Sequence, residues 1–168
     1  MPSKKLLIFI LALSLLLVPT MLLSQNEHYT GEVVVVSDGD TITVLTTDFE
    51  RIKVRFYGVD SPEKGQPYGD QAKNFLNGVL YGKTVEVEVK DIDRYSRYVG
   101  LVKLNGEMVN KLMVEAGYAW TYPYYCKDKS VCQVFKSSED KARREKKGLW
   151  EDPSPVAPWE WRRSKNSS

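Results

Sequence analysis

Residues Glu32–Asp60 read EVVVVSDGDTITVLTTDFERIKVRFYGVD, and this stretch decides the fold. Its apolar residues are spaced as expected for three β-strands, each with at least one buried face. SDGD, between the first two runs, has the turn chemistry of a hairpin, with a glycine available for a positive φ angle. TTDFE supplies the second turn. The stretch therefore predicts a three-stranded antiparallel meander.

The pattern after the meander alternates between helical and strand periodicity. It predicts a helix, two strands and two further helices, at residues 68–83, 84–90, 98–104, 107–119 and 137–150. Five short strands with a helix between the third and fourth suit a small closed barrel. We therefore expect an α+β, mainly β fold: a five-stranded OB-fold barrel with three helices.

The chain begins with an export-type segment. Lys4 and Lys5 precede an apolar run over residues 6–23, which is the charge-then-apolar order of a signal peptide. We expect residues 1–24 to be a cleaved signal, which predicts a secreted or periplasmic protein. The alternative is a retained membrane anchor with the domain outside the cytoplasm, because the run is just long enough to span a bilayer.

The remainder divides into one domain and a tail. No repeat or linker interrupts residues 31–150, which we expect to form a single domain. Residues 151–168 are rich in proline and then in charge, which predicts a flexible tail. This tail pairs tryptophans with arginines in the motif WEWRR, which fits contact with either a membrane surface or nucleic acid. The sequence does not decide between them.

Net charge gives no indication of a nucleic-acid partner. The chain has 24 basic and 22 acidic residues, and the only charges in its first 24 residues are Lys4 and Lys5, so the remainder is neutral. The basic run KARREKK is interleaved with acids, which predicts a solvated helix face with ion pairs rather than a DNA-binding surface. Any nucleic-acid function must therefore depend on a local site.

Cys126 and Cys132 are the only cysteines. In an exported protein an even count favours a disulfide, here around a short loop, with two free thiols as the alternative. A zinc site is disfavoured because the sole histidine, His28, lies far away in the sequence.

Two aspartates are candidate cation ligands. Asp40 follows the SDGD turn and Asp60 follows the third predicted strand, so adjacent antiparallel strands can bring their carboxylates together. Close carboxylates repel unless a positive charge lies between them. Oxygen ligands without histidine or thiolate favour Ca²⁺ or Mg²⁺, and the Ser61 carbonyl can add a third ligand.

Three further charged residues complete an inventory suited to phosphodiester cleavage. Arg55 alternates with the apolar side of its strand, and Arg97 precedes the fifth strand in the motif DRYSR. Their guanidinium groups can bind phosphate oxygens in pairs. Glu63, after Ser-Pro, can orient or deprotonate an attacking water.

The motifs SDGDTITV, RFYGVDSPE, DRYSR and ARREKKGLW, in this order, resemble those of the staphylococcal nuclease (thermonuclease) family. The resemblance implies an OB-fold, Ca²⁺-dependent endonuclease and exonuclease that hydrolyses DNA and RNA and leaves 3′-phosphates. We expect it to act as a monomer. The resemblance also implies metal ligation by Asp40, Asp60 and the Ser61 carbonyl, and catalysis by Arg55, Glu63 and Arg97.

The sequence departs from the family pattern at two places. Ser96 stands where a glycine is common, which affects how Arg97 is set. In TYPYYCKD, a proline replaces one tyrosine of the nucleotide pocket, whereas Tyr125 matches another. Tyr95 matches the tyrosine before the second arginine; with Arg94 and Tyr125 it forms the expected substrate-binding set, although packing roles are as consistent with the two tyrosines.

One alternative class of function remains open. OB-folds also serve as non-catalytic nucleic-acid-binding modules, and this one could be tethered to a membrane through residues 6–23. A degenerate module is expected to have lost part of the catalytic set, and none of its members is missing here.

Overall fold

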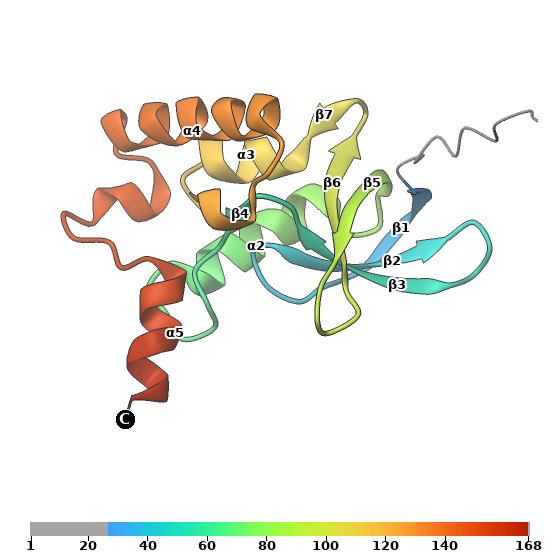
Figure 1. The fold of residues 1–168 in the computed structure, drawn as a ribbon, viewed down its shortest axis with the longest axis horizontal. Helices are drawn as coiled ribbons and strands as arrows, with labels where there is room; N and C mark the ends of the chain where they lie inside the picture. Colours follow the sequence, from blue (N-terminus) through green and yellow to red (C-terminus); the bar gives the residue numbers. More distant parts are fainter. Residues whose placement is uncertain (1–26, 168) are drawn as a thin grey trace, which may run out of the picture.

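The computed structural model of the protein describes residues 27–167 (Figure 1). The predicted signal or anchor, residues 1–24, lies outside the described residues. Within the described part of the chain, no helix is both long enough and apolar enough to span a membrane.

Five strands form a closed barrel, which confirms the predicted OB-type architecture. The main sheet has the order β3-β2-β1-β5-β6-β7, and a parallel pairing of β3 with β6 closes it. The three-stranded meander is present as predicted. The barrel strands are β1 (His28–Val36), β2 (Thr41–Thr46), β3 (Arg51–Phe56), β5 (Thr84–Ile92) and β6 (Tyr98–Leu104).

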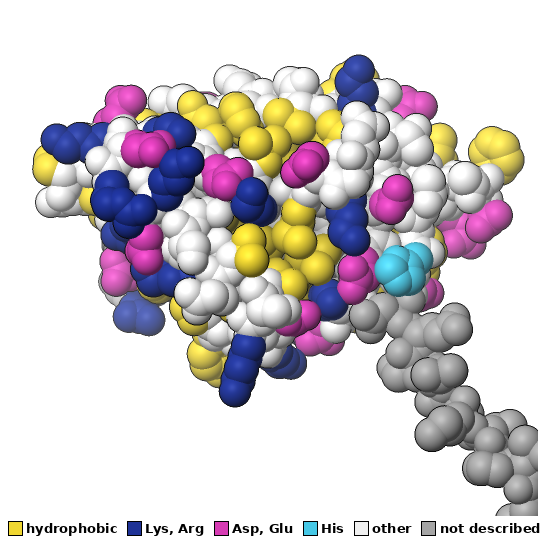
Figure 2. All heavy atoms as spheres, turned by 90° about the horizontal axis from the view of Figure 1, so that it is seen from above, with side chains coloured by type: hydrophobic (Ala, Val, Ile, Leu, Met, Phe, Trp, Pro, Cys, Tyr) yellow, Lys and Arg dark blue, Asp and Glu magenta, His cyan; other side chains and the backbone are white. Residues whose placement is uncertain are grey.

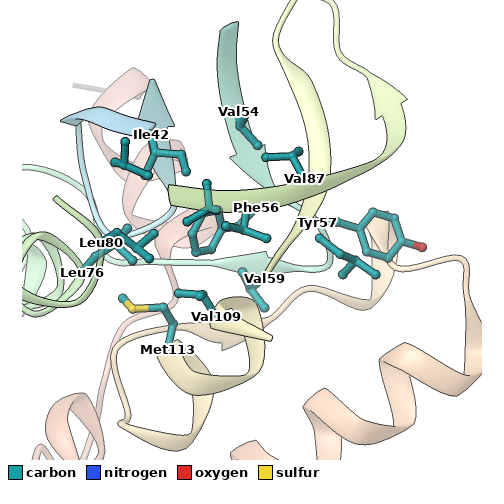
Figure 3. Close-up of a cluster of buried hydrophobic side chains, with 14 of the residues drawn as sticks. Ile42, Val54, Phe56, Tyr57, Val59, Leu76, Leu80, Val87, Val109 and Met113 are labelled. Atoms are coloured by element: carbon teal, nitrogen blue, oxygen red, sulfur yellow. The ribbon is translucent and has the colours of Figure 1, made fainter. Parts of the chain in front are cut away.

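Strand register directs one set of side chains into the barrel. Val44 pairs with Val33 on one side and with Ile52 on the other, and all three are buried. Figure 3 shows Phe56 among apolar side chains from the barrel, from α2 (Gly69–Leu80) and from α3 (Val109–Glu115). Because each buried apolar side chain contributes about 1.5–3 kcal/mol, this shared core fixes the two helices against the barrel.

The α-helices lie to one side of the barrel strands (Figure 1). Beyond α2 and α3, two more α-helices complete the described chain: α4 (Lys129–Arg144) and α5 (Pro158–Asn166). The short elements are β4 (Val59–Asp60), β7 (Glu107–Met108), β8 (Trp120–Thr121), η1 (Pro123–Tyr125) and η2 (Gly148–Glu151).

Two helices differ from their predicted bounds at both ends. The predicted helix at 107–119 begins as the short strand β7, and α3 occupies only residues 109–115. The predicted charged helix at 137–150 is α4, which begins eight residues earlier and ends at Arg144, before the separate element η2. Asp128 is its N-cap and accepts hydrogen bonds from the backbone N–H groups of Ser130 and Val131.

The prediction of a loose C-terminal tail is replaced by a docked helix. Pro158 occupies the first turn of α5, where a backbone N–H has no partner within the helix and the N–H that proline lacks is therefore not needed. Ala157 and Pro158 are buried, and the Trp159 ring stacks on Tyr122 with their centroids 4.9 Å apart. The aromatic residues that suggested an external surface contact in the sequence therefore include one that packs against the domain itself.

Two features of α4 bear on the earlier expectations. Its first turn carries Cys132, which forms a disulfide with Cys126.

Along the helix, Arg143 pairs with Glu139 and Lys136 with Asp140. Figure 2, which views the molecule from the α4 side, shows basic and acidic side chains interspersed. The face is therefore a mixed-charge surface rather than a continuous basic patch.

Candidate active site

The β2–β3 register brings the first candidate pair together. Thr41 pairs with Arg55 across the two strands, so Asp40 lies immediately beyond the end of this ladder. The backbone N–H of Phe56 donates to the Asp40 carbonyl at 2.8 Å and holds it there. The pairing of β2 with β3 thus holds Asp40 beside Arg55.

The glycine of the SDGD turn brings Asp40 close to the segment after β3. A Cβ atom on Gly39 would lie 2.7 Å from the Ser61 Cβ and 2.8 Å from the Ala72 Cβ, which is closer than real contacts allow. With no side chain there, the Ser61 N–H donates to Asp40 Oδ2 at 2.7 Å. All three proposed metal-binding residues, Asp40, Asp60 and Ser61, are buried at this point.

The guanidinium of Arg55 lies between the two buried aspartates. Its Nη1 donates to Asp40, and its Nη2 donates to Asp60 at 2.6 Å. Alternation correctly placed Arg55 on the side of β3 opposite Val54 and Phe56, but the side chain is only 20% exposed because the two carboxylates cover it. The positive charge that the sequence required between the aspartates is thus provided by a side chain of the protein itself.

Burial dominates the protonation of these carboxyl groups. It raises the pKa of Asp40 to about 6, although the Arg55 charge and the Ser61 N–H act in the opposite direction. Burial also raises the pKa of Asp60, against the hydrogen bonds and charges of the arginines around it. The two carboxylates are therefore costly to keep ionised, and they depend on the neighbouring positive charge.

Glu63 has an ion-pair partner that sequence reasoning missed. Arg162, on α5, donates through Nη1 to Glu63 and through Nη2 to Asp60 Oδ2 at 2.7 Å. The motif WEWRR was noted in the sequence, but its spacing did not indicate that Arg162 pairs with residues 99 and 102 positions earlier in the chain. The only sequence feature that could have indicated this helix was the proline at its start, followed by aromatic and basic residues.

Arg97 lies apart from the aspartate cluster, in the turn between β5 and β6. Its Nε donates to Asp93 Oδ2 at 2.7 Å, and Asp93 also accepts from the backbone N–H groups of Tyr95 and Arg97. These hydrogen bonds outweigh burial and lower the pKa of Asp93. Ser96, where the family commonly has glycine, adopts a φ of 58°, the left-handed conformation expected of that glycine.

One cleft of about 1100 Å³ brings the dispersed candidates together. Its wall includes Asp40, Arg55, Ser61 and Glu63 from the aspartate cluster and Arg97 from the turn before β6. The proposed substrate-binding residues also line it: Arg94, Tyr95 and Tyr125. Tyr95 is 65% exposed and Tyr125 is 56% exposed, so their rings are open to a ligand, and Arg94 lies over the Tyr95 ring.

Comparison with known proteins identifies the family. A model of staphylococcal nuclease homologues matches residues 53–152, more than half of the chain. A micrococcal nuclease of Shigella flexneri is 40% identical over 150 residues, which cover 83% of this chain and 84% of that protein. An uncharacterized endonuclease of Haemophilus influenzae is 39% identical over 155 residues, covering 92% of this chain and 85% of that protein.

A more distant relative covers the same domain within a longer protein. A staphylococcal-like nuclease of Arabidopsis thaliana is 38% identical over 116 residues, which cover 69% of this chain and 35% of that protein. The chain belongs to the staphylococcal nuclease family. The family and the nuclease names of these relatives support a nuclease function, and with it a hydrolase acting on nucleic acid.

Proposed function

We propose that the protein is a Ca²⁺-dependent nuclease that hydrolyses phosphodiester bonds of DNA and RNA, both within and at the ends of chains, and leaves 3′-phosphates. The observation that carries this proposal is the buried Asp40–Arg55–Asp60 cluster on a cleft that also holds Glu63 and Arg97. A binding module has no need of buried ionised carboxylates beside an open cleft, since they are costly to maintain.

The donor set fits a hard divalent cation. Asp40 and Asp60 offer carboxylate oxygens, now held by arginine, hydroxyl and backbone donors, and Ser61 lies against Asp40. Within residues 27–167, no three acidic, histidine or cysteine side chains form a metal-holding group, so water and substrate must complete the coordination. Bound there, Ca²⁺ would neutralise the phosphate charge and polarise the phosphoryl oxygen.

The remaining charged groups have separate roles in this proposal. Arg97 is held by Asp93 on the cleft wall, so an entering phosphate meets a guanidinium that is already oriented. Arg55 shares its donors with the aspartates and faces the same cleft. Glu63 orients or deprotonates the water that attacks phosphorus.

The exposed aromatic rings account for activity without base specificity. Tyr95 and Tyr125 line the cleft and are accessible, and base stacking on such rings tolerates any sequence. Arg94 donates to the Tyr95 hydroxyl at 2.7 Å and adds positive charge beside the ring. We propose these three residues as the substrate-binding set for either nucleic acid.

We also propose that the protein acts outside the cytoplasm, secreted or periplasmic, as a monomer. The Cys126–Cys132 disulfide supports this location because such bonds persist in oxidising compartments. The N-terminal order of lysines and apolar residues supports export. A retained anchor in residues 6–23 is the alternative; intact mass of the protein recovered from cells distinguishes the two.

The function is tested by cleavage and by the chemistry of the new ends. We expect the purified protein in Ca²⁺ to cut supercoiled plasmid and single-stranded RNA alike. The product ends should resist extension by a polymerase until a phosphatase removes their 3′-phosphate. Binding of both substrates without cleavage would instead establish the non-catalytic module.

Substitution of Arg97 separates catalysis from folding. We expect Arg97→Ala to lower kcat by about 10²-fold, because it removes a preoriented charge aimed at the transition state. Its stability should change by less than about 1 kcal/mol, since its partner Asp93 is a single residue in a surface turn. Plasmid cleavage rates and urea denaturation measure the two effects, with the exposed Arg144→Ala on α4 as control. An Arg97→Ala protein that cuts at the parental rate would refute the role.

A further inference from the structure

The C-terminal helix contributes directly to the active site. Arg162 contacts both Asp60 and Glu63, the two acidic residues at the ends of the segment Asp60-Ser61-Pro62-Glu63. Its guanidinium therefore joins a proposed metal ligand to the proposed water-handling carboxylate. Asp60 is fully buried and Glu63 is partly exposed to the cleft, so Arg162 lies where the buried cluster meets solvent.

A second connection joins the same segment to the C-terminal region through the backbone. Gln66, which is buried, accepts a hydrogen bond from the Glu63 N–H at 3.0 Å through its Oε1. Its Nε2 donates to the Val156 carbonyl at 2.8 Å, just before α5. Glu63 is thus connected to residues 156–162 in two ways. Its side chain pairs with Arg162, and its backbone N–H binds Gln66, which in turn binds the Val156 carbonyl.

The helix that supplies Arg162 is firmly anchored. Trp159 stacks on Tyr122 with an interplanar angle of 4° and meets the Trp120 ring edge-on at 5.7 Å. Tyr122 and Trp159 also line the cleft. Aromatic pairs of this kind contribute about 0.5–1.5 kcal/mol beyond the area that they bury, so α5 is a fixed wall of the site.

We propose that Arg162 is a positioning residue, and that residues 156–162 are an integral part of the catalytic machinery because they hold Glu63 in place. The inference rests on the nuclease function proposed above. Both terminal nitrogens of Arg162 donate to carboxylates, which favours positioning over direct phosphate binding. A planar fork can bridge two carboxylates at fixed geometry, whereas a lysine ammonium acts as a single point of charge.

Three matched variants test this role. Arg162→Lys keeps the charge and loses the fork, Arg162→Gln loses both, and Lys165→Gln on the same helix removes an exposed charge outside the site. We expect kcat to fall about 10- to 100-fold in both Arg162 variants, with KM nearly unchanged, because Glu63 is no longer fixed. Lys165→Gln should retain the parental kcat.

Amide hydrogen exchange provides a readout independent of activity. We expect residues 61–66 to exchange about tenfold faster in Arg162→Gln than in the parent or in Lys165→Gln, because the segment opens more often. If the protein lacks nuclease activity altogether, the proposed function fails while this exchange measurement still decides whether Arg162 orders the segment.

Gln66→Met keeps the proposal testable even if the Arg162 variants fold poorly. It preserves side-chain volume and removes the link between Glu63 and Val156, so kcat should fall and residues 61–66 should exchange faster. Unchanged kcat with unchanged exchange in the Arg162 and Gln66 variants would overturn the proposal. A higher kcat in Arg162→Gln would also overturn it, since Arg162 would then inhibit catalysis in the parent protein. A lower kcat without faster exchange would assign Arg162 to the substrate instead.

Discussion

Excess EGTA is expected to abolish nucleic-acid cleavage by this protein, and added Ca²⁺ to restore it. The aspartate cluster has more negative than positive charge: the three carboxylates of Asp40, Asp60 and Glu63 pair with the two guanidiniums of Arg55 and Arg162. A phosphodiester brings a further negative charge into this cleft. Without a divalent cation, repulsion should lower the rate by about 10³-fold or more, because the cation supplies several kcal/mol of transition-state stabilisation.

Mg²⁺ should restore little of the activity. Mg²⁺ demands near-ideal octahedral geometry and loses its water reluctantly, whereas Ca²⁺ accepts flexible sets of six to eight oxygens. In this site, Asp40 and Asp60 share their oxygens with arginine and backbone donors, so the carboxylates are not free to adjust to strict geometry.

Plasmid cleavage across a titration of each ion measures this preference. The control is the circular dichroism spectrum of the protein in EGTA, which shows whether loss of cleavage reflects loss of folding. Full cleavage in excess EGTA would contradict both the proposed cation and the charge argument.

The centre of the site could be predicted from the sequence because local rules determine it. The TTDFE turn connects β2 to β3, and their antiparallel register, with Thr41 opposite Arg55, places Asp40 of the SDGD turn beside Arg55. Asp60 lies in β4, directly after β3, so all three residues lie close together in the chain, within residues 40–60. The OB-type barrel followed from the same alternation and turn chemistry, since both depend on nearest neighbours in the chain.

The contribution of the C-terminal region could not be predicted in this way. Arg162 meets Asp60 across 102 residues, and only tertiary packing brings them together. A composition rich in proline and charge is typical of a loose tail, and here it is overridden by the packing of Trp159 on Tyr122. The early start of α4 was missed because its N-cap, Asp128, lies within the cysteine loop, which carried no clear helical periodicity.

Arg55→Met is expected to destabilise the fold as well as remove activity, which revises the expectation from strand alternation alone. Alternation places Arg55 on the side of β3 opposite Val54 and Phe56, where a side chain is expected to be exposed and its substitution to cost little stability. In the structure, the Arg55 side chain is largely buried between Asp40 and Asp60. Removing one member of a buried ion-pair group leaves uncompensated charge, which costs about 3–5 kcal/mol.

The pH dependence of this loss has a definite sign. Burial already raises the pKa of Asp40 to about 6 with Arg55 present, and removing that guanidinium should raise the pKa further. A carboxyl group whose pKa is higher in the folded than in the unfolded protein binds protons preferentially on folding. Its penalty is therefore absent at low pH and grows as the pH rises through the folded-state pKa. The stability deficit of Arg55→Met should thus be larger at pH 8 than at pH 5.

Arg51→Met is the matched control, because Arg51 lies on the same strand and the same side of β3 but is exposed. Its free energy of unfolding should stay within about 0.5 kcal/mol of the parent. Urea denaturation of both variants at pH 5 and pH 8 measures the effect, and Arg55→Met combined with Asp40→Asn should recover part of the loss by removing one of the unpaired carboxylates. Equal stability of Arg51→Met and Arg55→Met at pH 8 would show that the Arg55 guanidinium does not offset the free-energy cost of burying the two ionised aspartates. The aspartates would then have to be protonated in the folded protein, and the proposed binding of Ca²⁺ would have to release protons from both.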